Sequence, residues 1–552
     1  MSQPRWKVLL CLIVASSLLG VFPALAQNAP SADGSPASAT VKEKGTPAAP
    51  AKTKKSEKLS AEEREQRLMD RIEALEQLVA ELVAARTQPS ASPANTSTTS
   101  SPQPESNPAA SVANATDAPL ALPKGVTAAQ DPQPAEPFAF ADWSWLSGNP
   151  RTKDSPLKTK VFTGEFRADV AYHHDFNHPK DNTISGSSEV FRSGEIQLTH
   201  LGVGGDFNYN NVRGRVFSQL GMYSQTQPRN DASTGRGQWN LDNAYRYMTE
   251  AYGGYHFNKM HGINVDAGIF LSYVGLWSYY NFDNWTFQPS FVSSNTPWFF
   301  TGVRVQIFPT EKLKIEPWLI NGWQTYGKFH SAPGIGGQVQ YRPTSNLFLV
   351  FNSYIGTDTF GNPGRKRFHS DNSIQYKYYE NPNRFMSKAA VSLTVDLGCE
   401  FGGGVRCTGG NAVTPSQFFA GFMLYNRMWF KNDRFGLTLG GGAITNPGRY
   451  LVLLPPINGA TALSGTPYFT ANPGDSFRGL DGSITFDYMP SQFITWRWEY
   501  NHRTANVPYY TGPGGVTPPG GNQGTPGSLV PGFTPDLRKY ERRMTFAVLV
   551  KM

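Results

Sequence analysis

Residues 476–504 read SFRGLDGSITFDYMPSQFITWRWEYNHRT, two extended stretches joined at Pro490-Ser491. The second stretch alternates in character, with Ile494, Trp496, Trp498 and Tyr500 on one face and Arg497, Glu499 and Arg503 on the other. Alternation over about ten residues is typical of strands in a transmembrane β-barrel. Lipid offers backbone groups no hydrogen-bond partners, so only helices and closed barrels span a membrane. Beyond the N-terminus no apolar run approaches the ~18 residues of a spanning helix, which leaves the barrel.

The same unit recurs from about Thr159 to Met552. It predicts sixteen strands, at 159–173, 193–209, 212–223, 243–257, 263–275, 297–309, 313–325, 334–342, 347–356, 366–380, 384–398, 415–430, 434–446, 476–489, 492–504 and 538–552. Short connections such as Asn210-Asn211 alternate with longer ones, as in bacterial barrels with short periplasmic turns and long external loops. We therefore predict an all-β, antiparallel transmembrane β-barrel of about sixteen strands over residues 159–552. A soluble β-protein is the alternative, but it does not require this strict alternation of loop lengths.

The N-terminus has the features of an export signal. Arg5 and Lys7 precede an apolar stretch from Val8 to Phe22, and Ala24-Leu25-Ala26 is an A-x-A cleavage site. We expect residues 1–26 to be a signal peptide, with an N-terminal membrane anchor as the alternative.

Four segments separate this signal from the barrel. Residues 27–59 are rich in Ala, Pro, Ser and Lys and are predicted to be disordered. Residues 60–86 begin with a capping box and are predicted to form a coiled-coil helix, with an amphipathic surface helix as the alternative. Residues 87–136 form a Pro/Ser/Ala-rich linker. The pre-barrel segment, residues 137–158, contains Phe140, Trp143 and Trp145 and is a candidate plug or docking segment.

Cys399 and Cys407 flank a stretch with three consecutive glycines. These glycines allow the chain to reverse direction tightly, as a disulfide between the two cysteines needs, and an exported protein meets an oxidising compartment. We predict a disulfide between them. Reduced or metal-bound thiols are the alternative, although no His lies close in sequence to complete a zinc set.

Charged residues on the predicted strands are candidates for the pore lining. A barrel of about sixteen strands encloses a lumen, and a charge on its lipid face costs about 2–4 kcal/mol at mid-membrane. The predicted pore-lining residues are Arg213, Arg215, Arg304, Lys314, Glu316, Arg497, Glu499 and Arg503. A structural ladder of ion pairs across the lumen is the alternative role for each.

Three stretches resemble the putative beta-barrel porin-2 family of bacterial outer-membrane proteins. They are HGINVDAGIF at 261–270, SSNTPWFF at 293–300 and KIEPWLINGWQ at 314–324. The resemblance covers about residues 155–552 and implies a porin-like barrel without implying a particular solute. Met552 departs from the C-terminal aromatic residue that many such barrels carry.

The third long loop, Gly275 to Thr296, is rich in aromatic residues. In the general porins, which have sixteen strands, the third loop folds into the lumen, and the resemblance implies the same here. The candidate constriction residues are Trp277, Tyr279, Tyr280, Asp283, Trp285 and Phe287. An aromatic eyelet of this kind suits stacking on sugar rings. The alternative is that the loop packs against a neighbouring subunit or caps the rim of the barrel.

Charge and resemblance together predict a function. From residue 151 onward the sequence has 37 Lys and Arg against 27 Asp and Glu, a formal +10, which favours anions where the excess lines the pore. We predict a bacterial outer-membrane porin with a periplasmic N-terminal region, a homo-trimer in contact with outer-membrane lipids. It would conduct small hydrophilic solutes passively with a weak anion preference. A structural, envelope-tethering barrel with adhesive outer loops and no open channel is the alternative.

No motif predicts a catalytic site, a metal site or a cofactor. No nucleic-acid partner is expected either.

Overall fold

The computed structural model describes residues 136–552, apart from residues 229, 230, 232, 234, 235, 278, 448–473 and 522–529. The expected signal peptide (1–26), disordered segment (27–59), coiled coil (60–86) and nearly all of the linker (87–136) lie outside these residues. No helix among the described residues is long and apolar enough to cross a membrane.

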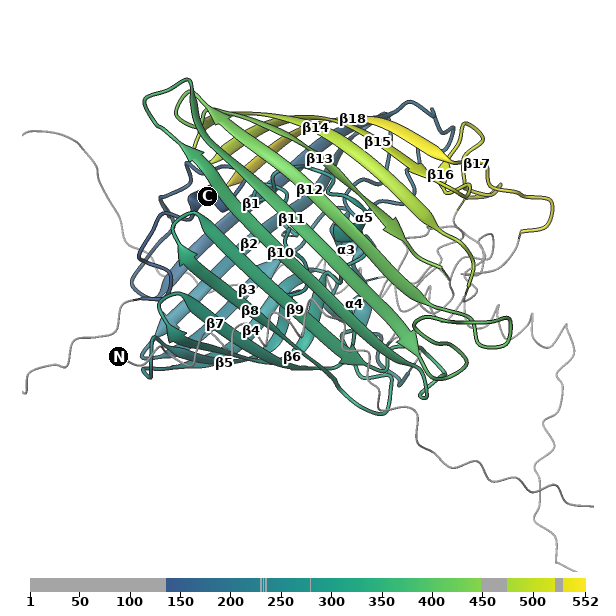
Figure 1. Cartoon of the computed structure of the whole chain (residues 1–552), viewed down its shortest axis with the longest axis horizontal. Helices are drawn as coiled ribbons and strands as arrows, with labels where there is room; N and C mark the ends of the chain where they lie inside the picture. The colour runs from purple at the N-terminus through teal and green to yellow at the C-terminus, as the bar shows by residue number, and fades with distance from the viewer. Residues whose placement is uncertain are drawn as a thin grey trace, which may run out of the picture. The chain divides into compact units, whose positions relative to one another are not determined.

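Sixteen antiparallel strands form a closed barrel (Figure 1), which confirms the predicted all-β antiparallel barrel and its number of strands. Their bounds are β1 Phe162–Asp175, β2 Ile196–Tyr209, β3 Val212–Ser218, β4 Met248–Phe257, β5 Ile263–Leu271, β6 Phe299–Thr310, β7 Leu313–Ile320, β8 Gly334–Thr344, β9 Leu347–Gly356, β10 Lys366–Glu380, β11 Met386–Phe401, β12 Phe418–Phe430, β13 Phe435–Thr445, β14 Arg478–Ser491, β15 Ile494–Ala505 and β18 Tyr540–Lys551. Each strand pairs with its neighbour in sequence, and β1 pairs with β18 to close the ring.

The remaining elements are small and are not part of the ring of strands. A two-stranded sheet, β16 Tyr510–Thr511 with β17 Leu537–Arg538, lies between β15 and β18. The short helices are η2 Ser144–Leu146, α3 Tyr223–Thr226, α4 Leu241–Tyr245 and α5 Phe291–Ser294.

Short turns and long loops alternate around the ring as predicted. The turn between β2 and β3 has Asn210 and Asn211 at φ of 47° and 67°, the left-handed conformation of a tight hairpin turn. The start of β1 and the end of β18 lie at the same end of the barrel as the short turns. The first, third and eighth of the long loops are L1 (176–195), L3 (272–298) and L8 (506–539).

The two faces of the sheet differ in character at almost every strand. In β14 the exposed Ile484 and Phe486 alternate with the buried Thr485 and Asp487. Aromatic pairs such as Phe435–Tyr488, with ring centroids 5.2 Å apart, lie where β13 and β14 approach a short turn. Apolar outer faces with aromatic residues near the strand ends are typical of barrels that span a membrane.

The pre-barrel segment lies across the short-turn mouth of the barrel. We call its residues 136–158 the crossbar. At one end the Phe138 N–H donates to the Glu311 carbonyl oxygen at 2.7 Å, in the turn between β6 and β7. At the other end the Asn149 side-chain amide donates to the Ser491 carbonyl oxygen at 3.2 Å, at the turn between β14 and β15. These two turns are half the ring apart, so the crossbar spans the mouth.

Aromatic residues hold the first half of the crossbar to the wall. The Arg342 guanidinium lies 4.2 Å from the centre of the Phe138 ring and 4.8 Å from that of Trp143. The Lys312 ammonium lies 4.9 Å from the centre of the Phe140 ring. Contacts of this type contribute about 0.5–1 kcal/mol each at exposed sites and more when desolvated.

Candidate functional site

L3 lies inside the barrel against the inner faces of β12, β13 and β14. Three glycines make room for it, because a Cβ at Gly421, Gly442 or Gly479 would lie 2.5–2.9 Å from side-chain atoms of Val292, Ser290 or Phe291. α5 therefore packs directly on the wall. A bulkier residue at any of the three positions would displace the loop.

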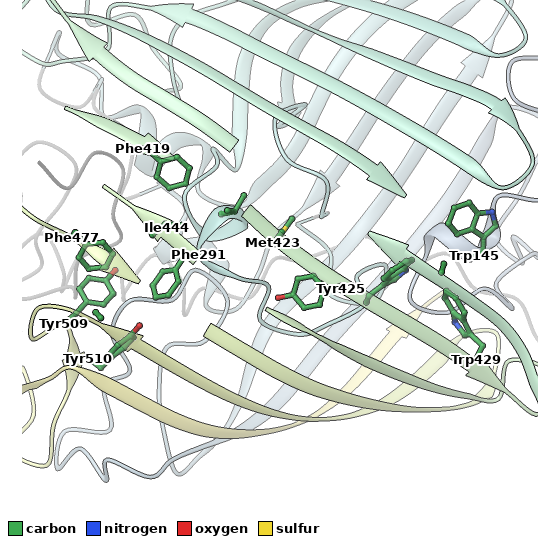
Figure 2. Close-up of a cluster of buried hydrophobic side chains, with 14 of the residues drawn as sticks. Trp145, Phe291, Phe419, Met423, Tyr425, Trp429, Ile444, Phe477, Tyr509 and Tyr510 are labelled. Carbon is green, nitrogen blue, oxygen red and sulfur yellow. The ribbon is translucent and has the colours of Figure 1, made fainter. Parts of the chain in front are cut away.

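A cluster of buried apolar side chains fills this side of the lumen. Figure 2 shows it as a band along the inner wall, from Phe477, Tyr509 and Tyr510 at one end to Trp145 and Trp429 at the other. Its members come from the crossbar, L3, L8 and the wall. The lumen is thus packed like a protein core on one side.

Charged residues beneath L3 bind its backbone. The Glu499 carboxylate accepts hydrogen bonds from the N–H groups of Phe287 at 2.6 Å and Gln288 at 2.9 Å. The Arg497 guanidinium donates to the carbonyl oxygens of Asn281 at 3.0 Å and Asn284 at 2.8 Å. These bonds supply partners for backbone groups that a buried loop would otherwise leave unsatisfied.

Asp487 joins L3 and the crossbar to the same point of the wall. Its carboxylate pairs with Arg497 and with Arg427, both at 2.7 Å, and all three side chains are fully buried. Arg427 donates to the carbonyl oxygens of Trp285 in L3 and Gly148 in the crossbar, at 3.1 and 2.7 Å. One carboxylate therefore orients two guanidinium groups that hold both inserted segments.

The opposite side of the lumen contains a cavity of about 310 Å³. Its wall is formed by L3 on one side and by β4–β8 on the other. The charged residues in its lining are Glu189, Glu250, Arg304, Lys314 and Glu316. The aromatic residues in its lining are Tyr273, Trp277, Tyr279, Trp298 and Trp318.

Charges on the strand side of this cavity are paired. Lys314 Nζ lies 2.7 Å from Glu316 Oε2, and Arg304 Nε lies 3.0 Å from Asp266 Oδ2. Glu250 Oε2 lies 2.7 Å from Arg215 Nε. These charged residues therefore form ion pairs with their neighbours, as in the structural ladder that is the alternative to a role in the pore lining.

One lining carboxyl group belongs to a loop. Glu189 lies in L1 and accepts a hydrogen bond from the Gln288 side-chain amide at 2.6 Å. Burial raises its pKa to about 7, although hydrogen bonds from Ser188 and Gln288 and the charges of Arg503 and Arg543 act in the opposite direction. The group therefore changes charge near neutral pH.

The predicted pore-lining residues divide between the two sides of the lumen. Arg304, Lys314 and Glu316 line the cavity, and Arg213 and Arg215 lie beside it on β3, paired with Asp266 and with Glu250. Arg497 and Glu499 are buried beneath L3, and Arg503 donates to the Gly186 carbonyl oxygen of L1. These three do not border the cavity, and we interpret them as anchors of the inserted loops.

The candidate constriction residues all lie within the barrel. Trp277 and the buried Tyr279 line the cavity, whereas Tyr280, Trp285 and Phe287 are buried and do not line it. The Asp283 carboxylate lies between Arg167 at 2.8 Å and Lys551 at 3.0 Å.

The predicted disulfide between Cys399 and Cys407 is confirmed, with the two Cα atoms 5.1 Å apart. It lies at the end of β11, away from the short turns. It closes a small loop outside the lumen lining described above.

Sequence reasoning did not single out Arg427 or Asp487. A signal was present, because Asp487 occupies an inward position between the outward-facing Phe486 and Tyr488. A carboxylate at a buried position requires a cationic or hydrogen-bonding partner. Of its two partners, Arg497 lies directly across the β14–β15 hairpin, whereas Arg427 lies on β12 and could not be identified from sequence.

Comparison with known proteins identifies a family. The family model for putative beta-barrel porin-2, OmpL-like, matches residues 166–526. A comparison with curated protein sequences gave no match.

Similar solved structures include an outer membrane protein, OmpT, an anion-selective porin and OprB. OmpT of Vibrio cholerae has 10% identity over 72% of this chain and 99% of its own, with a TM-score of 0.39. An anion-selective porin from Comamonas acidovorans has 8% identity over 71% and 99%, with a TM-score of 0.40. OprB of Pseudomonas putida has 10% identity over 71% and 94%, with a TM-score of 0.40. At these values the likenesses carry no argument about function.

Proposed function

Because this chain belongs to the putative beta-barrel porin-2, OmpL-like family, we propose that it is an outer-membrane channel that passively conducts small hydrophilic solutes. The observation that carries the proposal is the uneven filling of the lumen. L3 packs on β12–β14 and leaves a cavity of about 310 Å³ with polar and charged residues beside β4–β8. L3 would then narrow the channel without filling it.

The crossbar would set the width of the periplasmic exit. It crosses the mouth between two turns that are half the ring apart. Solutes would pass beside it rather than along the axis of the barrel.

Selectivity between anions and cations should be weak. The formal charge of +10 from residue 151 onward favours anions. The lining of the cavity adds little to that preference, because Arg304 and Lys314 are paired with carboxylates. Placement of charge at the narrow part of a pore matters more than its sum over the chain.

We also propose that the chain forms a homo-trimer among outer-membrane lipids, with its N-terminal region in the periplasm. The proposal rests on the coiled-coil spacing of residues 60–86 and on the family. Deleting residues 60–86 should weaken the oligomer on native gels. An unchanged oligomer would show that the helix does not drive assembly.

The channel is tested by planar-bilayer recording of the refolded full chain, with the reversal potential measured under a salt gradient. Stable conductance steps are expected. The reversal potential should be small, with the sign that indicates a slight preference for anions. A well-folded protein without steps would contradict the proposal. That result would favour the alternative, a structural, envelope-tethering barrel with adhesive outer loops and no open channel.

A further inference from the structure

The cavity beside β4–β8 has two chemically different sides. The L3 side presents aromatic rings, chiefly Trp277 and Trp298, both of which are half-buried. The strand side presents the carboxamides of Gln306 and Gln340 next to paired charges. Sites that bind small molecules typically combine aromatic surface with a few polar groups that orient the ligand.

Charged groups of the cavity have partners within the protein. Glu316 accepts hydrogen bonds from Lys314 and Gln306, both at 2.7 Å, and from the Trp318 indole N–H at 2.9 Å. Glu250 accepts from the Tyr280 hydroxyl at 2.9 Å and from Arg215. A charged solute would have to compete with these ion pairs, so the lining disfavours tight binding of simple ions.

The carboxamides retain hydrogen-bonding capacity. Gln340 donates to Gln338 Oε1 at 2.7 Å, and Gln306 donates to Glu316 and accepts from the Asn264 side-chain amide at 3.0 Å. A carboxamide has two N–H donors and an oxygen with two lone pairs, so each can bind a solute while keeping its contact in the wall. Neutral hydroxyl groups match both the donors and the acceptors.

The indole rings supply an apolar surface opposite these amides. Trp298 is fixed by an edge contact with Tyr279, with ring centroids 4.9 Å apart, and Trp277 by an edge contact with Tyr425 at 5.7 Å. The Trp277 indole N–H also points at Met423 Sδ, 3.2 Å away. Rings held in this way offer a preorganised surface for the C–H face of a ligand.

We infer that this cavity binds an uncharged, polyhydroxylated solute, a sugar of one or two rings. Its hydroxyl groups would bond to Gln306 and Gln340, and its C–H face would lie on Trp298 and Trp277. The volume of about 310 Å³ is at the lower end of the range for small-molecule sites, which favours a small sugar. The inference rests on the proposed channel, because it names the solute class of the same lumen.

The test is titration of maltose, glucose and inorganic phosphate against the KCl current of the refolded full chain in a planar bilayer. Either sugar should reduce the current in a saturable manner, and phosphate should not. Trp298→Ala should raise the half-blocking sugar concentration about tenfold, the factor that corresponds to about 1.4 kcal/mol. Trp239→Ala is the matched control, because Trp239 is 82% exposed and does not line the cavity.

The possible results of this test distinguish a failure of the sugar site from a failure of the proposed channel. Conductance steps with no block by either sugar, or block by phosphate alone, would overturn the sugar site and leave the channel intact. If no steps appear, the sugars are titrated into the refolded protein in detergent and tryptophan fluorescence is followed. A saturable change that Trp298→Ala weakens supports the site although the channel fails, and no change overturns the site.

Discussion

The backbone N–H of Gly148 donates to the carbonyl oxygen of Asp283 at 2.8 Å, which joins the crossbar directly to L3. The Trp285 indole N–H donates to the Leu146 carbonyl oxygen at 3.1 Å and makes a second link between the two segments. The crossbar and L3 are therefore one packed unit inside the barrel, although more than a hundred residues separate them in sequence.

Gly148→Ala should loosen this unit. A Cβ at residue 148 would lie 2.3 Å from the Asn284 carbonyl oxygen, so the crossbar must shift away from L3. Overpacking of this kind costs about 1–3 kcal/mol. We expect larger single-channel conductance and faster trypsin cleavage after Arg151.

The matched control for that variant is Gly253→Ala. A Cβ at Gly253 on β4 has no atom within 4 Å, so its conductance and cleavage should equal those of the wild type. Wild-type conductance together with wild-type protease resistance in Gly148→Ala would contradict a role for the contact.

Asp487→Asn should release both inserted segments at once. The substitution leaves the buried guanidinium groups of Arg427 and Arg497 without their shared counter-charge. Breaking a buried pair from one side costs about 3–5 kcal/mol. We expect a loss of that order in the free energy of unfolding in urea, followed by tryptophan fluorescence.

Asp206→Asn tests whether that loss is specific. Asp206 is half-exposed, and its partner Arg215 keeps Glu165 and Glu250. This variant should change the free energy of unfolding by less than about 1 kcal/mol. Equal losses in the two variants would show that Asp487 has no special anchoring role.

Glu189 should make ion selectivity depend on pH. Burial raises its pKa to about 7, so the carboxyl group is neutral below that pH and adds a negative charge to the cavity above it. The reversal potential in a salt gradient should move toward cation preference between about pH 5.5 and about pH 8.5.

Glu189→Gln should abolish that movement, since an amide does not titrate. Glu195→Gln is the control, because Glu195 lies in the same loop but is half-exposed, paired with Arg192 and absent from the cavity lining. A pH-dependent shift that survives in Glu189→Gln would assign the titration to another group.

Replacing Cys399 and Cys407 with serine should affect stability and not conductance. The disulfide joins residues only eight apart in sequence, and closing so short a loop contributes about 2–3 kcal/mol in the chain-entropy model. The urea midpoint should fall while single-channel conductance remains unchanged. A changed conductance would indicate that the loop between the cysteines reaches the channel.

The strands could be predicted because lipid outside and polar groups inside impose a two-residue period on every segment. The predicted ranges 347–356 and 366–380 coincide with β9 and β10. The first strand was expected at 159–173 and is found at Phe162–Asp175, a small shift of the kind that end positions commonly show.

The division of the lumen could not be predicted from the same pattern. Arg304 and Arg497 both alternate with apolar neighbours and both point inward, yet one lines the cavity and the other lies beneath L3. The difference depends on where L3 packs, which is decided by glycines on β12–β14, far from L3 in sequence. Strand periodicity carries no information about contacts between segments so distant.

The crossbar also has a mechanical consequence. A closed ring of strands resists stretching through its hydrogen bonds, but it can flatten into an ellipse with little change in those bonds. The crossbar ties the turn at Glu311 to the turn at Ser491, half the ring away. It therefore links two opposite points of the rim, so that widening the mouth along that diameter requires breaking the contacts at both ends of the crossbar. The mouth of this barrel should therefore deform less than the mouth of a barrel that has no crossbar.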